Sequence, residues 1–293
     1  MININNEKLI SIVLPTYNGS KCIKNSIESV LNQTYTNFEL IIVNDASTDN
    51  TLDIINDYAK KDNRIKIINN DVNKKLPASL NVGFREASGD YLTWTSDDNK
   101  YHKDALYIMA DELNDNPNID MVYANFNRIK IDGTFIEEVK FEDPDKLKYY
   151  NVIGACFLYR NSMKEKIGEY DEELFLAEDY EYWIRVYLNG NIKHIDKTLY
   201  DYSMHEKSLT STRVKEVLKA TIKTKLKHEK ELLKKCINQS ERNEYYRMNL
   251  YYINDINEYK KMRKNYYKND IIYFIQDIIK RVKNKILGKG HLV

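Results

Sequence analysis

Short apolar runs alternate with helical patterns through the first hundred residues, and this alternation constrains the fold more than any other feature of the chain. Between the runs, apolar residues recur at helical spacing, as at Ile23, Ile27 and Val30. Such alternation predicts parallel βαβ units with right-handed crossovers. In sheets of this kind, ligands bind outside the carboxyl ends of the strands. The predicted strands are Leu9–Leu14, Phe38–Val43, Ile65–Ile68 and Tyr91–Trp94.

Polar loops follow three of these strands, and we expect all three loops on one rim of the sheet. They are Pro15–Asn18, Asn44–Ser47 and Ser96–Asn99. The last loop carries two adjacent carboxylates, Asp97 and Asp98. Oxygen ligands of this kind suit Mg²⁺ or Mn²⁺, which bind one or two carboxylates and complete their shell with water and substrate phosphates.

The charge balance divides the chain into two predicted regions. Residues 1–212 carry 24 Lys and Arg against 35 Asp and Glu, whereas residues 213–293 carry 21 against 9. In the acidic region, Asp132-Gly133 predicts a hairpin turn, residues 174–188 a helix and residues 198–203 a strand. We therefore expect a catalytic domain over residues 1–212 and a basic helical region over residues 213–293.

Three segments, Ser11–Asn18, Ser26–Tyr35 and Phe38–Asp49, resemble the inverting family 2 glycosyltransferases of GT-A fold, and the likeness extends over roughly residues 8–212. The resemblance implies an α/β fold in which helices flank a mixed, Rossmann-like nucleotide-binding sheet. A C-terminal helical appendage follows it. The resemblance also implies sugar transfer from a nucleotide sugar, expected to be a UDP-sugar, to a hydroxyl of a glycan or lipid-linked acceptor.

The family places the nucleoside against the positions of Pro15, Tyr17 and Asp45. Tyr17 offers a flat face on which a base can stack, and Asp45 offers an acceptor for an N–H of the base. Ser47 and Thr48 are better placed than Asp45 to cap the following helix.

The Asp97-Asp98 pair matches the family's metal and nucleotide motif. The resemblance implies that Asp98 binds Mn²⁺ or Mg²⁺ and that Asp97 contacts the sugar or the ribose. Thr95 stands where a common version of the motif has a further aspartate, which leaves less negative charge for the metal. His205 lies in a closing segment, Tyr200–Ser211, similar to that of the family, and either joins the metal shell or donates to the diphosphate.

Inverting transfer requires a base for the proton of the acceptor hydroxyl. The segment Phe175–Val186 resembles the family's Glu-Asp motif and implies that Asp179 is the base and that Glu178 is a supporting contact to acceptor or donor sugar. Residues Asn151–Cys156 correspond to a stretch that faces the acceptor.

Two other functions conflict with the sequence. A sugar nucleotidyltransferase needs a glycine-rich basic loop after the first strand, and Pro15–Ser20 has only Gly19. A non-catalytic GT-A-like assembly protein would have lost the carboxylates, and all are present. Nucleic acid is not an expected partner of the acidic body. Three widely spaced cysteines and the lack of any apolar run of about 18 residues favour a cytoplasmic protein.

The basic C-terminal region ends in an amphipathic pattern. Ile271, Ile275, Ile278 and Val282 share one helical face, and lysine and arginine crowd the end. This pattern is typical of helices that lie on anionic membranes, here the inner face of the cell membrane. Equally, the face could pack on the catalytic domain or on a second copy in a homodimer.

Overall fold

The computed structural model describes residues 7–205, 208 and 212–287 and divides into two compact units. The first unit takes in the chain up to Leu147 together with Asn151–Val214. The second takes in the chain from Lys215 onward together with the three-residue segment Lys148–Tyr150.

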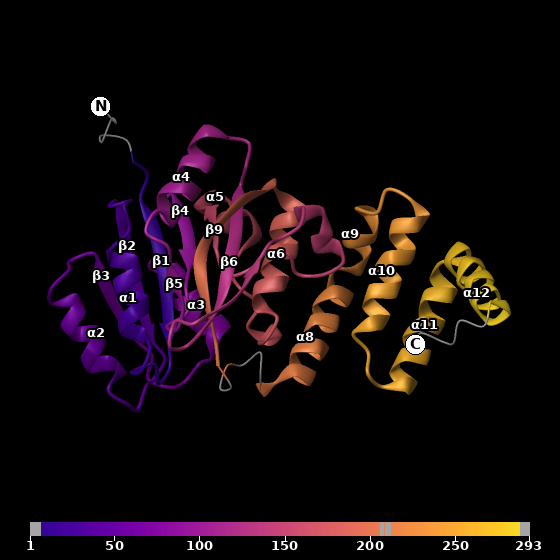
Figure 1. The fold of residues 1–293 in the computed structure, drawn as a ribbon, viewed down its shortest axis with the longest axis horizontal. Helices are drawn as coiled ribbons and strands as arrows, with labels where there is room; N and C mark the ends of the chain where they lie inside the picture. Colours follow the sequence, from indigo (N-terminus) through magenta and orange to yellow (C-terminus); the bar gives the residue numbers. More distant parts are fainter. Residues whose placement is uncertain (1–6, 206–207, 209–211, 288–293) are drawn as a thin grey trace. The chain divides into compact units, whose positions relative to one another are not determined.

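The first unit contains a nine-stranded sheet flanked by helices (Figure 1). Its strand order is β3-β2-β1-β4-β8-β6-β9-β5, with β7 paired to β6. Strands β3, β2, β1 and β4 are parallel, β8 is antiparallel to both β4 and β6, and β9 is parallel to β6. The sheet is therefore mixed, as predicted. The strands are β1 Ile10–Thr16, β2 Phe38–Asn44, β3 Ile65–Asn69, β4 Tyr91–Trp94, β5 Lys100–Tyr101, β6 Met121–Lys130, β7 Phe135–Val139, β8 Phe157–Arg160 and β9 Ile192–Met204.

Helices cover both faces of the parallel part, which explains why every residue of β1 and β2 is buried. Alternate β1 side chains, such as Ile12, pack with Ile27 and Val30 of α1. The opposite face of β1, at Val13, meets α3. The helices of this unit are α1 Ile23–Leu31, α2 Thr51–Ala59, α3 Leu76–Arg85, α4 Ala105–Asp115, α5 Asn161–Ile167 and α6 Glu178–Asn189.

Most of the predicted elements are present, with two differences in their bounds. The strand predicted over 198–203 is the later part of β9, which begins at Ile192. The hairpin is confirmed, and Gly133 adopts a φ of 89° in its turn. The predicted helix over 174–188 instead begins at Glu178. Leu176 has a φ of 79°, which an α-helix cannot include, so the preceding residues Glu172–Leu174 form only a 3₁₀ turn.

The second unit consists of helices around a tyrosine-rich core. Tyr246 lies 4.4 Å from Tyr266 and 4.6 Å from Tyr273 between ring centroids. Buried Lys148 donates to Glu241 at 2.7 Å, and buried Lys225 donates to the Tyr149 carbonyl at 2.7 Å, which explains why the 148–150 segment belongs to this unit. The helices are α8 Val214–Lys227, α9 Glu229–Lys234, α10 Gln239–Tyr251, α11 Ile256–Asn269 and α12 Ile271–Ile286.

Gly83 allows α3 to approach the sheet closely, and this contact makes a testable prediction. A Cβ at Gly83 would collide with Val13 Cγ1 and crowd Val43. Alanine ordinarily stabilises a helix by about 1 kcal/mol relative to glycine, but here we expect Gly83→Ala to lower the free energy of unfolding by about 1–3 kcal/mol through overpacking. Chemical denaturation measures the change. Val82→Ile, which adds one methyl at a half-buried position, is the control, and a Gly83→Ala protein as stable as wild type would contradict the packing.

Candidate functional site

The loops after β1 and β4 are joined through Asp97. Thr16 Oγ1 donates to Asp97 Oδ2 at 2.5 Å, and Ser26 Oγ of α1 donates to the Ser96 carbonyl at 2.8 Å. A Cβ on Gly19 would collide with Asp97 Oδ2, so the β1–α1 loop closes over this carboxylate only because residue 19 is glycine. Burial, aided by the charge of Asp98, raises the pKa of Asp97 to about 6.

Asp45 follows β2 and is almost fully buried. Its Oδ1 accepts from Asn70 Nδ2 at 2.7 Å and from the Lys74 N–H at 2.9 Å, and its Oδ2 accepts from the Lys75 N–H at 2.9 Å. A carboxylate has about four acceptor positions, so one remains on Oδ2 for a ligand. Asp45 therefore shapes the loop before α3 and can still accept a hydrogen bond from an N–H of a nucleotide base.

The β1 and β2 loops are joined through Asn18, which has a φ of 56°. The Asn18 N–H donates to Ser47 Oγ at 3.0 Å, and Asn18 Oδ1 accepts from the Thr48 N–H at 2.8 Å. The expectation that Ser47 and Thr48 cap α2 is therefore wrong, because both bond across to the neighbouring loop. The N-cap residue of α2 is Asn50, which makes no side-chain cap bond, and Asp49 Oδ1 accepts from the N–H of the first helical residue, Thr51, at 3.0 Å.

Pro15 and Tyr17 lie on the same rim but differ in exposure. Pro15 is buried at the end of β1, opposite Val43 of β2. The Tyr17 side chain is 51% exposed, which leaves its ring available as a stacking surface. Because the Asn18 contacts connect this loop to the loop that carries Asp45, Tyr17 and Asp45 lie on adjoining loops, as expected.

Asp98 meets the end of β9. Its Oδ2 lies 2.9 Å from His205 Nε2, and Ser203 Oγ donates to the Asp98 carbonyl at 2.5 Å. This separation is that of a hydrogen bond between the two side chains. It also matches the spacing of about 3 Å between adjacent ligands of an octahedral Mg²⁺ with bonds of 2.0–2.1 Å, so an ion could take the place of the shared proton. Within the described part of the chain, no three His, Cys, Asp or Glu side chains cluster closely enough to hold a metal. Residues 206, 207 and 209–211 of the predicted closing segment lie outside the described residues.

Thr95, the departure from the motif, points into the core. Its hydroxyl is buried and lies 2.6 Å from the Tyr200 hydroxyl. Thr95 therefore contributes to the packing beside Tyr200 and supplies no carboxylate to the site.

Glu178 and Asp179 begin α6 and form a second acidic group. Asn151 Nδ2 donates to Asp179 Oδ2 at 3.2 Å, and Asp179 Oδ1 accepts from the Tyr180 N–H at 2.6 Å. Glu178 Oε2 accepts from the Leu176 N–H at 2.6 Å. Burial raises the pKa of both carboxyls, and the neighbouring Asp179 charge raises that of Glu178 further. The pair therefore retains a proton above the ordinary carboxyl range.

A buried tyrosine connects this pair to the end of β4. Trp94 Nε1 donates to the Tyr170 hydroxyl at 3.1 Å. Burial, with smaller contributions from Tyr182 and Asp179, raises the pKa of Tyr170. Trp94 lies at the end of β4, three positions before Asp97. The charge of Asp179 therefore acts on a tyrosine that is hydrogen-bonded to the strand that leads to Asp97.

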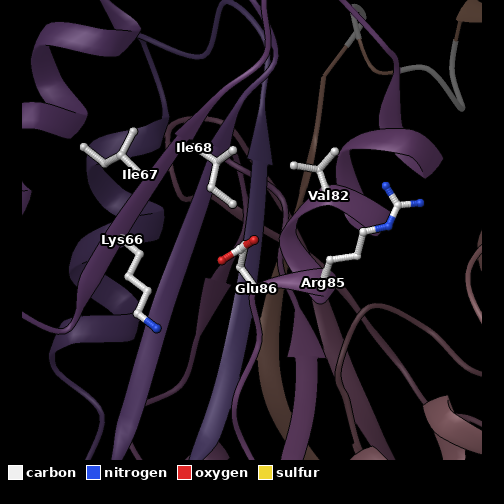
Figure 2. Close-up of a pocket in the computed structure, with 6 residues that line it drawn as sticks. All are labelled: Lys66, Ile67, Ile68, Val82, Arg85 and Glu86. Atoms are coloured by element: carbon white, nitrogen blue, oxygen red, sulfur yellow. The ribbon is translucent and has the colours of Figure 1, made fainter.

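A separate hollow of about 300 Å³ lies between β3 and the end of α3 (Figure 2). None of its lining residues is a predicted site residue. They are Lys66, Ile67, Ile68, Val82, Arg85 and Glu86.

Comparison with known proteins gives a family match and close relatives. Residues 11–172 match the family model described as "Glycosyl transferase family 2". The chain is 28% identical over 214 residues to WfgD of Escherichia coli, named UDP-Glc:alpha-D-GlcNAc-diphosphoundecaprenol beta-1,3-glucosyltransferase. The alignment covers 71% of this chain and 82% of WfgD. It is 29% identical over 220 residues to an uncharacterised glycosyltransferase of Rickettsia prowazekii, covering 71% of this chain and 68% of the relative.

Solved structures give the same architecture. TarS 1–349 of S. aureus in complex with UDP-GlcNAc aligns with a TM-score of 0.63 at 20% identity, over 83% of this chain and 80% of that one. The mannosyltransferase PcManGT from Pyrobaculum calidifontis, in complex with GDP-Man and Mn²⁺, aligns with a TM-score of 0.63 at 12% identity, over 96% and 81%. The chain spans about half (49%) of a longer TarS structure. At these identities the likeness shows the fold, and it confirms the predicted GT-A α/β architecture.

The buried Glu178 predicts a pH-dependent stability. Its pKa, raised to about 8 in the folded protein, means that the folded state keeps a proton which the unfolded chain releases in the ordinary glutamate range. Stability is therefore lost as the pH rises from about 4.5 to about 8. Glu178→Gln removes this loss, so we expect its free energy of unfolding to exceed that of wild type increasingly across this window, by on the order of a few kcal/mol at the upper end.

Urea denaturation at several pH values measures the difference. Glu165→Gln, at an exposed glutamate on α5, is the control and should give no such trend. A constant difference between Glu178→Gln and wild type from pH 5 to pH 8 would contradict the raised pKa.

Proposed function

The chain belongs to glycosyl transferase family 2, and we propose that it transfers a sugar from a UDP-sugar to a hydroxyl of a lipid-linked glycan acceptor, with inversion at the anomeric carbon. The observation that carries the proposal is the convergence of Tyr17, Asp45 and the Asp97-Asp98 pair at the carboxyl ends of three adjacent parallel strands. Family membership decides against a sugar nucleotidyltransferase.

On the donor side, the base stacks on Tyr17 and donates an N–H to the remaining acceptor position of Asp45 Oδ2. The exposure of Tyr17 and the three existing hydrogen bonds of Asp45 support these roles. Asp97, held by Thr16, accepts from hydroxyls of the ribose or the sugar. Pro15, the residue before the last in β1, lies beneath the nucleoside.

On the acceptor side, Asp179 is the general base. As the acceptor oxygen forms its bond to the anomeric carbon, the bond from that carbon to the diphosphate oxygen breaks, and the acceptor proton passes to Asp179 Oδ2. Asn151 orients that carboxylate, and Glu178, held by the Leu176 N–H, supports the sugar or the acceptor.

Asp98 and His205 would hold a divalent ion, Mn²⁺ or Mg²⁺. Their atoms are 2.9 Å apart, a separation that suits neighbouring ligands. When bound, such an ion supplies positive charge that stabilises the diphosphate as it leaves. PcManGT, a structural neighbour, was solved with Mn²⁺.

The choice of substrates follows the relatives. The name of WfgD specifies a UDP-Glc donor and a diphosphoundecaprenol-linked GlcNAc acceptor, and TarS was solved with UDP-GlcNAc. This supports a UDP-sugar and an acceptor of the lipid-diphosphate class, in the context of bacterial polysaccharide synthesis. GDP-Man in PcManGT is the alternative donor to include in any screen.

The role of Asp179 is tested by replacing the carboxylate with its isosteric amide. A panel of UDP-, GDP- and TDP-sugars with Mn²⁺ first identifies the donor by nucleotide release and thermal stabilisation. Asp179→Asn should then lower transfer by at least about 10²-fold, because the base is lost, while nucleotide affinity stays within about threefold of wild type. Asp115→Asn, at an exposed aspartate on α4, is the control. Transfer at the wild-type rate by Asp179→Asn would reject the assignment, and stabilisation by no nucleotide would reject the proposed function.

The metal site is tested by calorimetric titration of UDP with and without Mn²⁺. Asp98→Asn should abolish the Mn²⁺-dependent gain in UDP affinity, because the carboxylate of the Asp98–His205 pair is lost. His205→Ala should reduce this gain without abolishing it. Affinity for UDP in the absence of metal should change by less than about threefold in either variant. An unchanged Mn²⁺ effect in Asp98→Asn would exclude Asp98 as the ligand.

A further inference from the structure

Helix α12 has a wide apolar face that its own unit does not bury. The exposed fractions of its aliphatic side chains lie between 42% and 78%. Tyr273 is its only buried residue. The side chains of this face, called here the α12 face, are Ile271, Ile272, Ile275, Ile278, Ile279, Val282 and Ile286.

The opposite side of α12 makes the contacts with the helical unit. Tyr273 packs 4.6 Å from Tyr246 of α10, and Asp277 Oδ2 accepts from Arg263 Nη2 at 2.5 Å and from the Tyr267 hydroxyl, both of α11. At about 100° per residue, Tyr273 and Asp277 lie about 180° around the helix from the centre of the α12 face. The face therefore points away from the core that holds the helix in place.

The charges around the α12 face are positive. By the same helical geometry, Lys283 lies just beyond one edge of the face and Lys285 just beyond the other, and both are exposed. Lys280 follows on the Lys283 side. Lysine stems at the edges of an apolar face can extend along it while their ammonium groups reach anionic headgroups.

The width of the face favours a flat surface over a second helix. A two-stranded coil uses a narrow seam of a and d positions, whereas the α12 face spans about 120° because Ile272, Ile279 and Ile286 widen it. A homodimer through α12 would also bring together two regions that each carry 21 Lys and Arg against 9 Asp and Glu. An anionic surface complements that charge instead.

We propose that α12 lies on an anionic lipid surface, with the α12 face among the acyl chains and its flanking lysines at the headgroups. In the part of the chain that the structure describes, no helix has the length and apolar character to cross a bilayer, so this contact is interfacial. The proposal does not depend on glycosyl transfer, although a lipid-linked acceptor would be presented at such a surface.

Vesicle flotation of the full chain tests whether α12 binds an anionic lipid surface. No nucleotide sugar is added, so the result does not depend on whether the protein is an active enzyme. The vesicles are phosphatidylcholine with and without phosphatidylglycerol, at low and at high salt. We expect binding to the anionic vesicles, weakened by salt, and a loss of at least about tenfold in Ile275→Glu/Ile279→Glu. The matched control is Ile237→Glu/Ile256→Glu, which adds the same charge at exposed isoleucines of the same unit and should bind like wild type.

Three results would overturn the proposal. One is a wild-type chain that does not float with anionic vesicles at low salt. Another is unchanged binding by Ile275→Glu/Ile279→Glu, with helix content confirmed by circular dichroism. The third is that light scattering without lipid shows a dimer for wild type and a monomer for Ile275→Glu/Ile279→Glu. This result would assign the α12 face to a second copy of the chain.

Discussion

The parallel pairing of β2, β1 and β4 is the constraint on which the candidate site depends. Thr16 is in register with Asn44, and Val13 is in register with Trp94. Three loops therefore leave the sheet at one edge, and residues that are 81 positions apart, such as Thr16 and Asp97, become neighbours. The hydrogen bond from Thr16 to Asp97 is a direct consequence of this register. Without it, the Asp97-Asp98 pair would be an ordinary solvated turn.

Much of this arrangement could be predicted from the sequence, because buried parallel strands have a continuous apolar signal and a characteristic length. Tyr91–Trp94, for example, is a strand in both the prediction and the structure. The contacts between loops were not predictable in this way. Asn18, Ala46 and Lys75 all adopt positive φ, and such local conformations leave no periodic pattern. Gly19 can be read from the sequence, but the reason for a glycine there is the close approach of Asp97, which only the structure shows.

The acidic pair at the start of α6 illustrates a conflict between stability and function. The helix N-terminus and the N–H groups of Leu176 and Tyr180 favour negative charge there. Burial opposes it and raises the pKa of both Glu178 and Asp179. A base that must accept a proton benefits from a raised pKa, so the cost in stability serves the proposed chemistry. The Glu-Asp motif in the sequence identified Glu178 and Asp179 as candidate residues. It did not predict the burial that raises the pKa of both.

Among the residues that the structure describes, only His205 joins Asp98 as a candidate metal ligand, and this has a thermodynamic consequence. Asp98 comes from the loop after β4, and His205 follows the last residue of β9, so the pair forms only when the whole sheet is assembled. Two ligands leave most positions of an octahedral ion to water or to donor phosphates. An ion held in this way would raise the affinity for a nucleotide diphosphate, and by linkage the diphosphate would raise the affinity for the ion by the same factor. Thr95, whose hydroxyl bonds to Tyr200 in the core, adds no charge to the site. The donor itself would complete the site.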